Sequence, residues 1–254
     1  MIPYFQFTVF HLGPVPIQVW GSMVALGMLV GAGIMYRLCK KDRLKVDFIP
    51  DLIMWVLVSA LFFSRVFHVV FYDLHYYLEQ PGEILKIWHG GLSSLGGFFG
   101  AALAAIIFLK KKKITYDLFL PYADRGLLGL WLGWGIGRIG CFLIHDHPGT
   151  LSHFVLAVKY SNGTRHDLGL YESITGFLLF IVFFIVYTLC PNIKKGVIMN
   201  ASIACYAVVR FCTDFLRVVD MRYLSLTPAQ WGMIMIFGLT MWNLFGKNKQ
   251  FFKD

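Results

Sequence analysis

The chain has 254 residues, of which 57% are hydrophobic, 17% aromatic and only 15% charged. Soluble domains carry about a quarter charged residues, so this composition excludes an ordinary soluble protein and predicts a polytopic membrane protein. The length suits a single integral membrane domain, residues 1–254, with about seven spans of roughly 20 residues each.

Seven apolar helices are expected, at 17–37, 52–72, 92–109, 120–143, 172–190, 197–216 and 228–246. No positively charged segment precedes the first helix and no small-residue cleavage site follows it, so the first span is expected to remain as an anchor. The N-terminal stretch from Pro3 to Pro16 is too short and broken to span, and its aromatic residues favour the outer membrane interface.

Basic residues concentrate in alternate loops, at 37–45, 110–113, 194–195 and 247–253. The positive-inside rule therefore places the N-terminus outside and the C-terminus in the cytoplasm. Although the net charge of +9 suggests nucleic acid as a partner, the lysines at 110–113 are better interpreted as a topology anchor on anionic lipid. No nucleic-acid role is expected.

Arginines inside the spans need partners, because burying each costs at least ~2.5 kcal/mol on insertion scales. Arg125 lies near the cytoplasmic end beside Asp124, where its side chain can reach water. Arg65, Arg138 and Arg210 lie on three different helices, about five to seven residues from the outer end of each. Three arginines are thus expected at one depth, near the outer headgroups.

Small residues recur along the first, third and fourth helices, and they are typical of close helix packing. They are Gly27, Gly31, Gly96, Gly97, Gly100, Gly126, Gly129, Gly133, Gly137 and Gly140. The segment from His89 to Gly97 differs, since four glycines and two serines precede and begin the third helix. Such a helix start is a weak signal for anion binding.

The long outer loop, 144–171, contains a strand-like segment at 154–160 followed by a turn at 161–163. Candidate proton acceptors on the outer side are His89, His145, Asp146 and His147. A metal held by 145–147 is a weak alternative, because no fourth ligand is evident and the five cysteines form no Cys-x-x-Cys pair. Neither a metal nor a cofactor is therefore expected.

The sixth helix carries a polar stripe of Tyr206, Arg210, Asp214 and Arg217. At 100° per residue these positions share an arc of about 80°. Salt bridges within the helix are one explanation, and a functional pocket is the other. Several arginines facing a tyrosine and carboxylates favour a phosphate site, and the membrane setting makes an anionic phospholipid the natural ligand.

These residues resemble the prolipoprotein diacylglyceryl transferase family. The resemblance extends from Gly13-Pro14 through Ser64-Arg65, the segment 90–93, Gly137-Arg138-Ile139-Gly140 and Leu170-Tyr171-Glu172 to the sixth helix. It implies an enzyme of the bacterial inner membrane that faces the outer leaflet. Its partners would be phosphatidylglycerol, membrane lipid and the lipobox peptide of a prolipoprotein, whose cysteine receives the diacylglyceryl group as glycerol phosphate leaves.

By this resemblance Arg138 and Arg210 hold the phosphate, with Arg65 at the same depth. Tyr206, Asp214 and Arg217 line the same pocket. Tyr171 and Glu172 support it from the fifth helix.

The chain also departs from the family pattern. Leu95 stands where the family has a histidine held to be important for catalysis, and Cys141, Ile144 and Asp146 replace two asparagines and a glutamate. Two alternatives therefore remain beside the family reaction: a diverged paralogue with another acceptor, or a phospholipid-binding protein without turnover. A seven-span transporter is disfavoured because the polar residues do not form a path through the midplane.

Overall fold

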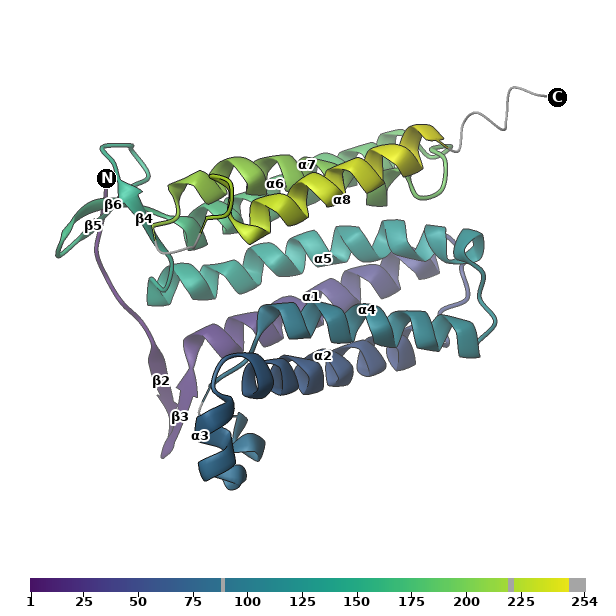
Figure 1. The fold of residues 1–254 in the computed structure, drawn as a ribbon. Helices are drawn as coiled ribbons and strands as arrows, with labels where there is room; N and C mark the ends of the chain where they lie inside the picture. Colours follow the sequence, from purple (N-terminus) through teal and green to yellow (C-terminus); the bar gives the residue numbers. More distant parts are fainter. Residues whose placement is uncertain (88–89, 219–221, 247–254) are drawn as a thin grey trace. The chain divides into compact units, whose positions relative to one another are not determined.

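The computed structural model describes residues 1–87, 90–218 and 222–246, and it is mostly helical (Figure 1). The chain divides into two compact units, Met1–Leu38 with Leu120–Asp254, and Cys39–Phe119. Helices α1 (Val19–Lys41) and α5 (Tyr116–Ile144) each cross a boundary between the units. The single integral domain expected from the sequence stays a prediction.

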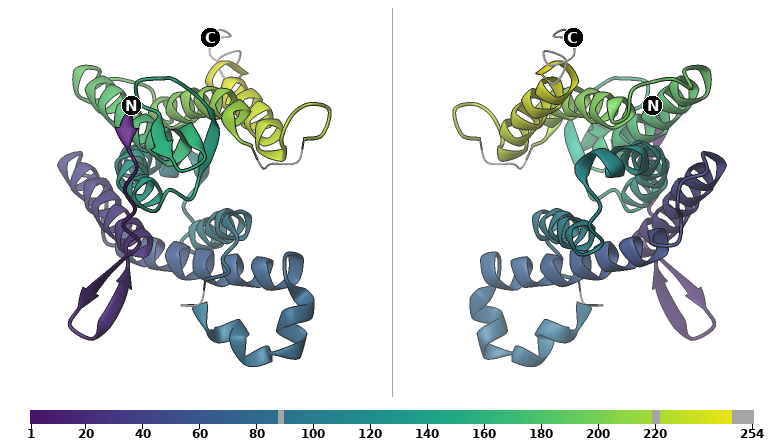
Figure 2. Two further views of the ribbon diagram at one scale, coloured as in Figure 1. Left: turned by 90° about the vertical axis from the view of Figure 1, so that its left-hand side faces the viewer. Right: turned by 90° about the vertical axis from the view of Figure 1, so that its right-hand side faces the viewer.

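The first unit contains most of α1 and α5 together with α6 (Leu168–Leu189), α7 (Val197–Thr213) and α8 (Pro228–Phe245). A short 3₁₀ helix, η3 (Asp214–Leu216), continues α7. Helices α7 and α8 lie side by side (Figures 1 and 2). The apolar core of this unit comprises Leu38, Leu128, Trp131, Leu179, Phe183, Tyr187 and Ile198.

Glycines bring the backbones of α1 and α5 into direct contact. Gly27 lies against Gly133, and Gly31 against Gly129. A Cβ atom added at Gly31 would lie only 2.6 Å from the Gly129 carbonyl oxygen. The packing role predicted for these four glycines is therefore confirmed, because any side chain here would force the helices apart.

The loop between α5 and α6 folds into a small sheet with the N-terminal strand. The strands are β1 (Ile2–Pro3), β4 (Pro148–Leu151), β5 (Val158–Tyr160) and β6 (Gly163–Asp167), in the order β1-β5-β6-β4. Strand β1 runs parallel to β5, with Ile2 opposite Val158, whereas the other pairs are antiparallel. A separate hairpin joins β2 (Val9–Leu12) to β3 (Val15–Gln18).

Two aspartates fix the starts of α6 and α7. Asp167 accepts a hydrogen bond from the Leu170 amide at 3.0 Å and caps α6. Asp124 of α5 is buried, and its carboxylate accepts hydrogen bonds from the backbone amides of Gly196 and Met199 at 2.7 and 2.8 Å. A carboxylate suits this position because the first amides of a helix have no partners within the helix.

The second unit contains α2 (Ile49–Phe71), α3 (Leu74–Glu79), a 3₁₀ helix η1 (Pro81–Leu85) and α4 (Ser94–Lys111). Helices α2 and α4 pack side by side (Figure 2). Gly96 and Gly100 allow this approach, and a Cβ at Gly100 would lie 2.5 Å from the Ser59 carbonyl oxygen. The Ser59 hydroxyl donates to the Gly100 carbonyl at 3.0 Å across the same contact.

All seven helices expected from the sequence are present, with ends displaced by four residues or fewer. The expectation of an all-α chain was incomplete, since it lacked both sheets. The strand expected at 154–160 begins only at Val158. In the described part of the chain, five helices are long and apolar enough to cross a bilayer: α1, α2, α5, α6 and the continuous stretch Val197–Leu216. Helices α4 and α8 are not among them, so seven crossings and their direction stay predictions.

Candidate functional site

Glu172, the fifth residue of α6, lies between two arginines from neighbouring helices. Its Oε2 is 3.1 Å from Arg138 Nε on α5, and its Oε1 forms an ion pair with Arg210 Nη1 on α7. The carboxylate is only 5% exposed, so it requires such partners to remain ionised. Glu172 therefore draws α5, α6 and α7 together around one charged centre.

Asp214 extends this centre toward α8. It is fully buried, and its Oδ1 lies 3.1 Å from Arg210 Nη2 and 3.2 Å from Arg217 Nε. Its Oδ2 accepts a hydrogen bond from the Thr227 hydroxyl, which also caps α8. The salt bridges that were one explanation of the polar stripe are present, and they form part of a larger network, whereas a functional pocket at the stripe stays a prediction.

We call five of these residues the arginine network: Arg138, Glu172, Arg210, Asp214 and Arg217. The network carries three positive and two negative charges. Its net positive charge favours an anion, and each guanidinium presents a planar fork of donors. The arginine side chains are 13–21% exposed, whereas the two carboxylates are 5% or less exposed. The cationic groups are therefore more accessible to a ligand than the carboxylates that orient them.

Aromatic rings line one side of Arg138. Its guanidinium lies 4.5 Å from the centre of the Trp134 ring, a cation–π contact. Tyr206 packs against Trp131 and Trp134, with ring centres 5.1 and 5.9 Å apart. Tyr206 thus contacts the aromatic wall beside Arg138, and it lies on the same helix as Arg210.

Asp146 and His147 follow the end of α5 and lie close to the arginine network. Their Oδ2 and Nε2 atoms are 3.8 Å apart, and each side chain is about one-third exposed, 33% and 32%. Burial raises the pKa of the Asp146 carboxyl, although His147 and Arg138 oppose the rise. Burial lowers the pKa of the His147 imidazole, opposed by Asp146 and reinforced by Arg138 and Arg217. His147 is therefore neutral at physiological pH and able to accept a proton.

Cys141 is the buried neighbour of this pair. Its sulfur, a carboxylate oxygen of Asp146 and a ring nitrogen of His147 all lie within 4.8 Å of one another. Arg138 Nη1 donates to the same sulfur at 3.7 Å. The family resemblance identified Cys141 only as a replacement, because the loop conformation that brings it to Asp146 and His147 has no sequence signature.

His145 lies apart from the arginine network. Its ring is fully buried, with Nδ1 2.6 Å from Asp167 Oδ2, and it stacks on Tyr4. The Tyr160 hydroxyl donates to the same Asp167 oxygen at 2.7 Å, and burial and that carboxylate raise the Tyr160 pKa. The role of His145 as a proton acceptor stays a prediction, and this burial argues against it.

Tyr171 is hydrogen-bonded to the loop. Its hydroxyl lies 2.6 Å from His166 Nδ1, and burial lowers the pKa of His166. Its support of a lipid pocket stays a prediction.

Arg65 belongs to the second unit, where backbone carbonyls surround its side chain. It donates to the carbonyl oxygens of Ile84 and Gly91 at 2.9 and 2.8 Å, and its guanidinium lies 5.1 Å from the Tyr77 ring centre. These contacts anchor the segment between α2 and α4, and a lipid role for Arg65 stays a prediction. His89 lies outside the described residues.

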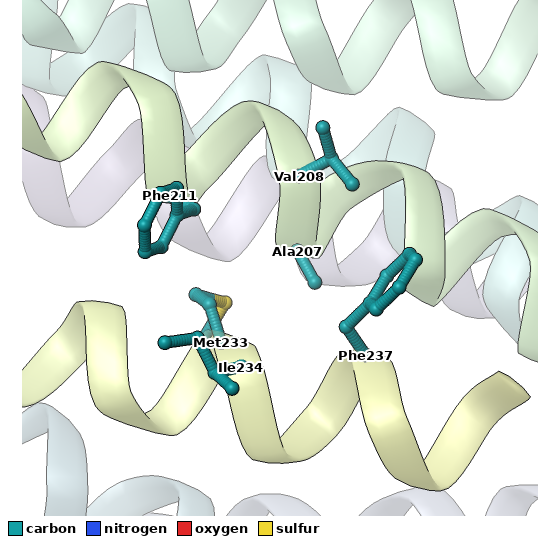
Figure 3. Close-up of a pocket in the computed structure, with 6 residues that line it drawn as sticks. All are labelled: Ala207, Val208, Phe211, Met233, Ile234 and Phe237. Carbon is teal, nitrogen blue, oxygen red and sulfur yellow. The ribbon is translucent and has the colours of Figure 1, made fainter. Parts of the chain in front are cut away.

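An apolar groove lies between α7 and α8 (Figure 3). Its lining is Ala207, Val208, Phe211, Met233, Ile234 and Phe237, and its volume is about 210 Å³. A second apolar hollow of about 420 Å³ shares Val208 and Phe237 with it. Together they form a groove along α7 with an almost wholly apolar surface.

Comparison with known proteins gives the same family that the motifs suggested. The family model described as Prolipoprotein diacylglyceryl transferase matches residues 7–245. A phosphatidylglycerol–prolipoprotein diacylglyceryl transferase of Staphylococcus aureus is 31% identical over 236 residues, covering 87% of this chain and 81% of the relative. A protein of the same name from Bacillus velezensis is 30% identical over 228 residues, covering 85% and 82%. The chain therefore belongs to the prolipoprotein diacylglyceryl transferase family.

Proposed function

We propose that this protein transfers the diacylglyceryl group of phosphatidylglycerol to the cysteine thiol of a prolipoprotein and releases glycerol phosphate. Its relatives are named phosphatidylglycerol–prolipoprotein diacylglyceryl transferases, which supports the lipid donor, the acceptor and the group transferred. The observation that carries the proposal is the arginine network, in which buried carboxylates orient accessible guanidinium groups from α5 and α7. Such groups suit a phosphate whose negative charge increases as the carbon–oxygen bond breaks.

In this reaction Arg138 and Arg210 hold the phosphate, and Arg217 adds positive charge on the same side. The acceptor thiolate attacks the glycerol carbon, a carbon–sulfur bond forms, and the electron pair of the broken carbon–oxygen bond leaves with the phosphate oxygen. Asp146 and His147, whose charges interact with Arg138, take the thiol proton. Glu172 and Asp214 keep the arginines in place throughout.

The proposed setting is the bacterial cytoplasmic membrane. All seven long helices cross it, the N-terminus and the 144–171 loop face outward, and the lysine-rich loops face the cytoplasm. The arginine network then lies at the outer-leaflet headgroups, where phosphatidylglycerol presents its phosphate. One acyl chain of that lipid occupies the apolar groove between α7 and α8, since Phe211 of the groove adjoins Arg210 in the chain.

The direct test is to combine the purified protein with phosphatidylglycerol vesicles and a lipobox peptide. We expect a thioether lipopeptide by mass spectrometry and an equal amount of glycerol phosphate. Arg138→Ala should lower the rate by at least about 10²-fold, because it removes a charged donor at the leaving group. Arg125→Ala is the matched control, as Arg125 lies on the same helix but bonds the Pro121 carbonyl. Absence of product with correctly folded protein contradicts the proposal.

A second function is favoured by one specific observation. Position 95 is a leucine that is 67% exposed, where the family resemblance expects a histidine. A diverged paralogue would move the same lipid group to another acceptor. Lipid and protein mass spectrometry of a deletion strain separates the two functions. If the protein is the paralogue, its deletion leaves lipoprotein modification intact while another lipidated product disappears. Lipid that co-purifies through Arg210 without any product would instead indicate a binding protein.

A further inference from the structure

The side chains of Cys141, Asp146 and His147 form a compact group of three different metal-binding atoms. Each offers one ligand atom, and these atoms lie within 4.8 Å of one another. Cys141 is buried in the last turn of α5, whereas Asp146 and His147 are about one-third exposed in the loop that follows. The group is therefore shielded from solvent at Cys141 and accessible from solvent at Asp146 and His147.

A single ion of the zinc class would bring these atoms, now within 4.8 Å of one another, only slightly closer together. With bond lengths of about 2.0–2.3 Å to nitrogen, oxygen and sulfur, the edges of a tetrahedron are about 3.3–3.8 Å. The imidazole nitrogen and carboxylate oxygen are already 3.8 Å apart. Three protein ligands leave one tetrahedral position for a fourth, which is the arrangement of catalytic and not of structural zinc sites.

Arg138 and Arg217 lower the pKa of His147 and therefore oppose a positive charge here, so the ligands must supply the compensating negative charge. A thiolate and a carboxylate together balance the two charges of the ion, and the occupied site is therefore neutral beside Arg138. Arg138 Nη1 also donates to the Cys141 sulfur at 3.7 Å, and Glu172 holds its Nε at 3.1 Å. Such a second contact orients a metal ligand, and it links the three-residue group directly to the arginine network.

We propose that Cys141, Asp146 and His147 bind a divalent zinc-class ion, and that the acceptor thiol takes the open fourth position. The proposal rests on the transferase function above and changes how the thiol is activated. A coordinated thiol loses its proton outright, and the thiolate is the reactive nucleophile. The ion thus holds the acceptor sulfur close to Arg138, which contacts the ligand Cys141 and binds the phosphate.

The reaction balances without any oxidant or reductant. The thiol proton leaves to water when sulfur coordinates, and the sulfur electron pair forms the bond to the glycerol carbon. The carbon–oxygen bond breaks with its electrons on the phosphate oxygen, and glycerol phosphate departs as an anion. The neutral thioether product is a weaker ligand than the thiolate, so it leaves the ion.

The test measures metal directly, independently of turnover. The full chain purified without chelator is expected to retain about one zinc per chain by elemental analysis, and to bind Co²⁺ with a thiolate-to-cobalt charge-transfer band. Cys141→Ser and His147→Ala should each lower Co²⁺ affinity at least about tenfold. Cys190→Ser is the control and should bind normally, because Cys190 is exposed and lies beyond the end of α6.

The fourth position is tested with the acceptor. A lipobox peptide should increase the charge-transfer band of the Co²⁺ protein, whereas the same peptide with serine in place of cysteine should not. Co²⁺ affinity that is equal in Cys141→Ser, His147→Ala and Cys190→Ser overturns the metal site. Full transferase activity in metal-free protein also overturns it, and leaves Asp146 and His147 as direct proton acceptors. A normal Co²⁺ site without any lipopeptide product overturns the transferase function instead.

Discussion

At the scale of single residues, Glu172 determines how the charged centre is arranged. Its two oxygens contact Arg138 and Arg210, which come from different helices. A phosphate that binds these arginines must compete with, or be added beside, a carboxylate that already aligns them. The side chain thus has a structural role even before any ligand is present.

Glu172→Ala should lower the free energy of unfolding by about 3–5 kcal/mol, because it leaves two partly buried guanidinium groups without their shared carboxylate. Thermal unfolding in detergent, followed by tryptophan fluorescence, measures the change. Glu79→Ala is the control, since that side chain is 63% exposed and its loss should cost less than about 0.5 kcal/mol. Equal unfolding temperatures for the two variants contradict this role.

His166 should contribute a pH-dependent part of the stability. Burial lowers its pKa below the ordinary value of 6.5, so the folded chain holds the imidazole neutral. As pH falls through 6.5 the unfolded chain takes up a proton that the folded chain refuses, and stability is lost until the pH reaches the folded pKa.

Comparing unfolding temperatures of the wild type and His166→Gln from about pH 8 to about pH 5.5 isolates this part, because the other histidines are common to both. The wild type should lose more stability than the variant over this range. Parallel curves would show that His166 does not contribute.

At the scale of elements, the contact between α1 and α5 depends on the absence of side chains. Gly31→Ala should weaken the folded protein, since the new Cβ would lie 2.6 Å from a backbone oxygen that cannot move alone. Gly33→Ala on the same helix is the matched control, because nothing lies within 4 Å of its Cβ position. The control should be neutral or stabilising by about 0.4–1 kcal/mol. Thermal unfolding decides, and equal losses in both variants would exclude specific packing at Gly31.

The helices were predictable from the sequence, whereas their caps and the sheet were not. Runs of about 20 apolar residues identify a helix without knowledge of its neighbours. Asp124 was interpreted only as a neighbour of Arg125, because the amides that it accepts belong to Gly196 and Met199 on another helix. Strand β1 was missed for the same reason, since its partner β5 is distant in the chain.

The candidate site was also predictable from the sequence only in part. The spacing of Arg210, Asp214 and Arg217 predicts their mutual ion pairs, because residues three and four apart are neighbours on a helix. The buried pair of His145 and Asp167 was not predictable, as it depends on a left-handed conformation at His145, with φ of +53°. That conformation directly follows the end of α5 at Ile144.

At the scale of the whole molecule, the proposed topology can be tested with two cysteines. Ser161, in the exposed turn between β5 and β6, should face outward, and the exposed Cys190 should face the cytoplasm. In a chain with Cys205 and Cys212 replaced by serine, a Ser161→Cys variant should react with an impermeant maleimide in intact cells. In the same chain with Ser161 retained, Cys190 should react with the maleimide only after the cells are permeabilised. The reverse pattern contradicts the orientation.

The parallel pairing of β1 with β5 also has a consequence for biosynthesis. Ile2 leaves the ribosome long before its partner Val158, which follows only after α1, α2, α4 and α5 have been made. The N-terminal strand must therefore wait, unpaired, while four long helices are synthesised. Its capture by the later strands completes the sheet, and this sets a late step in maturation that a truncated nascent chain cannot reach.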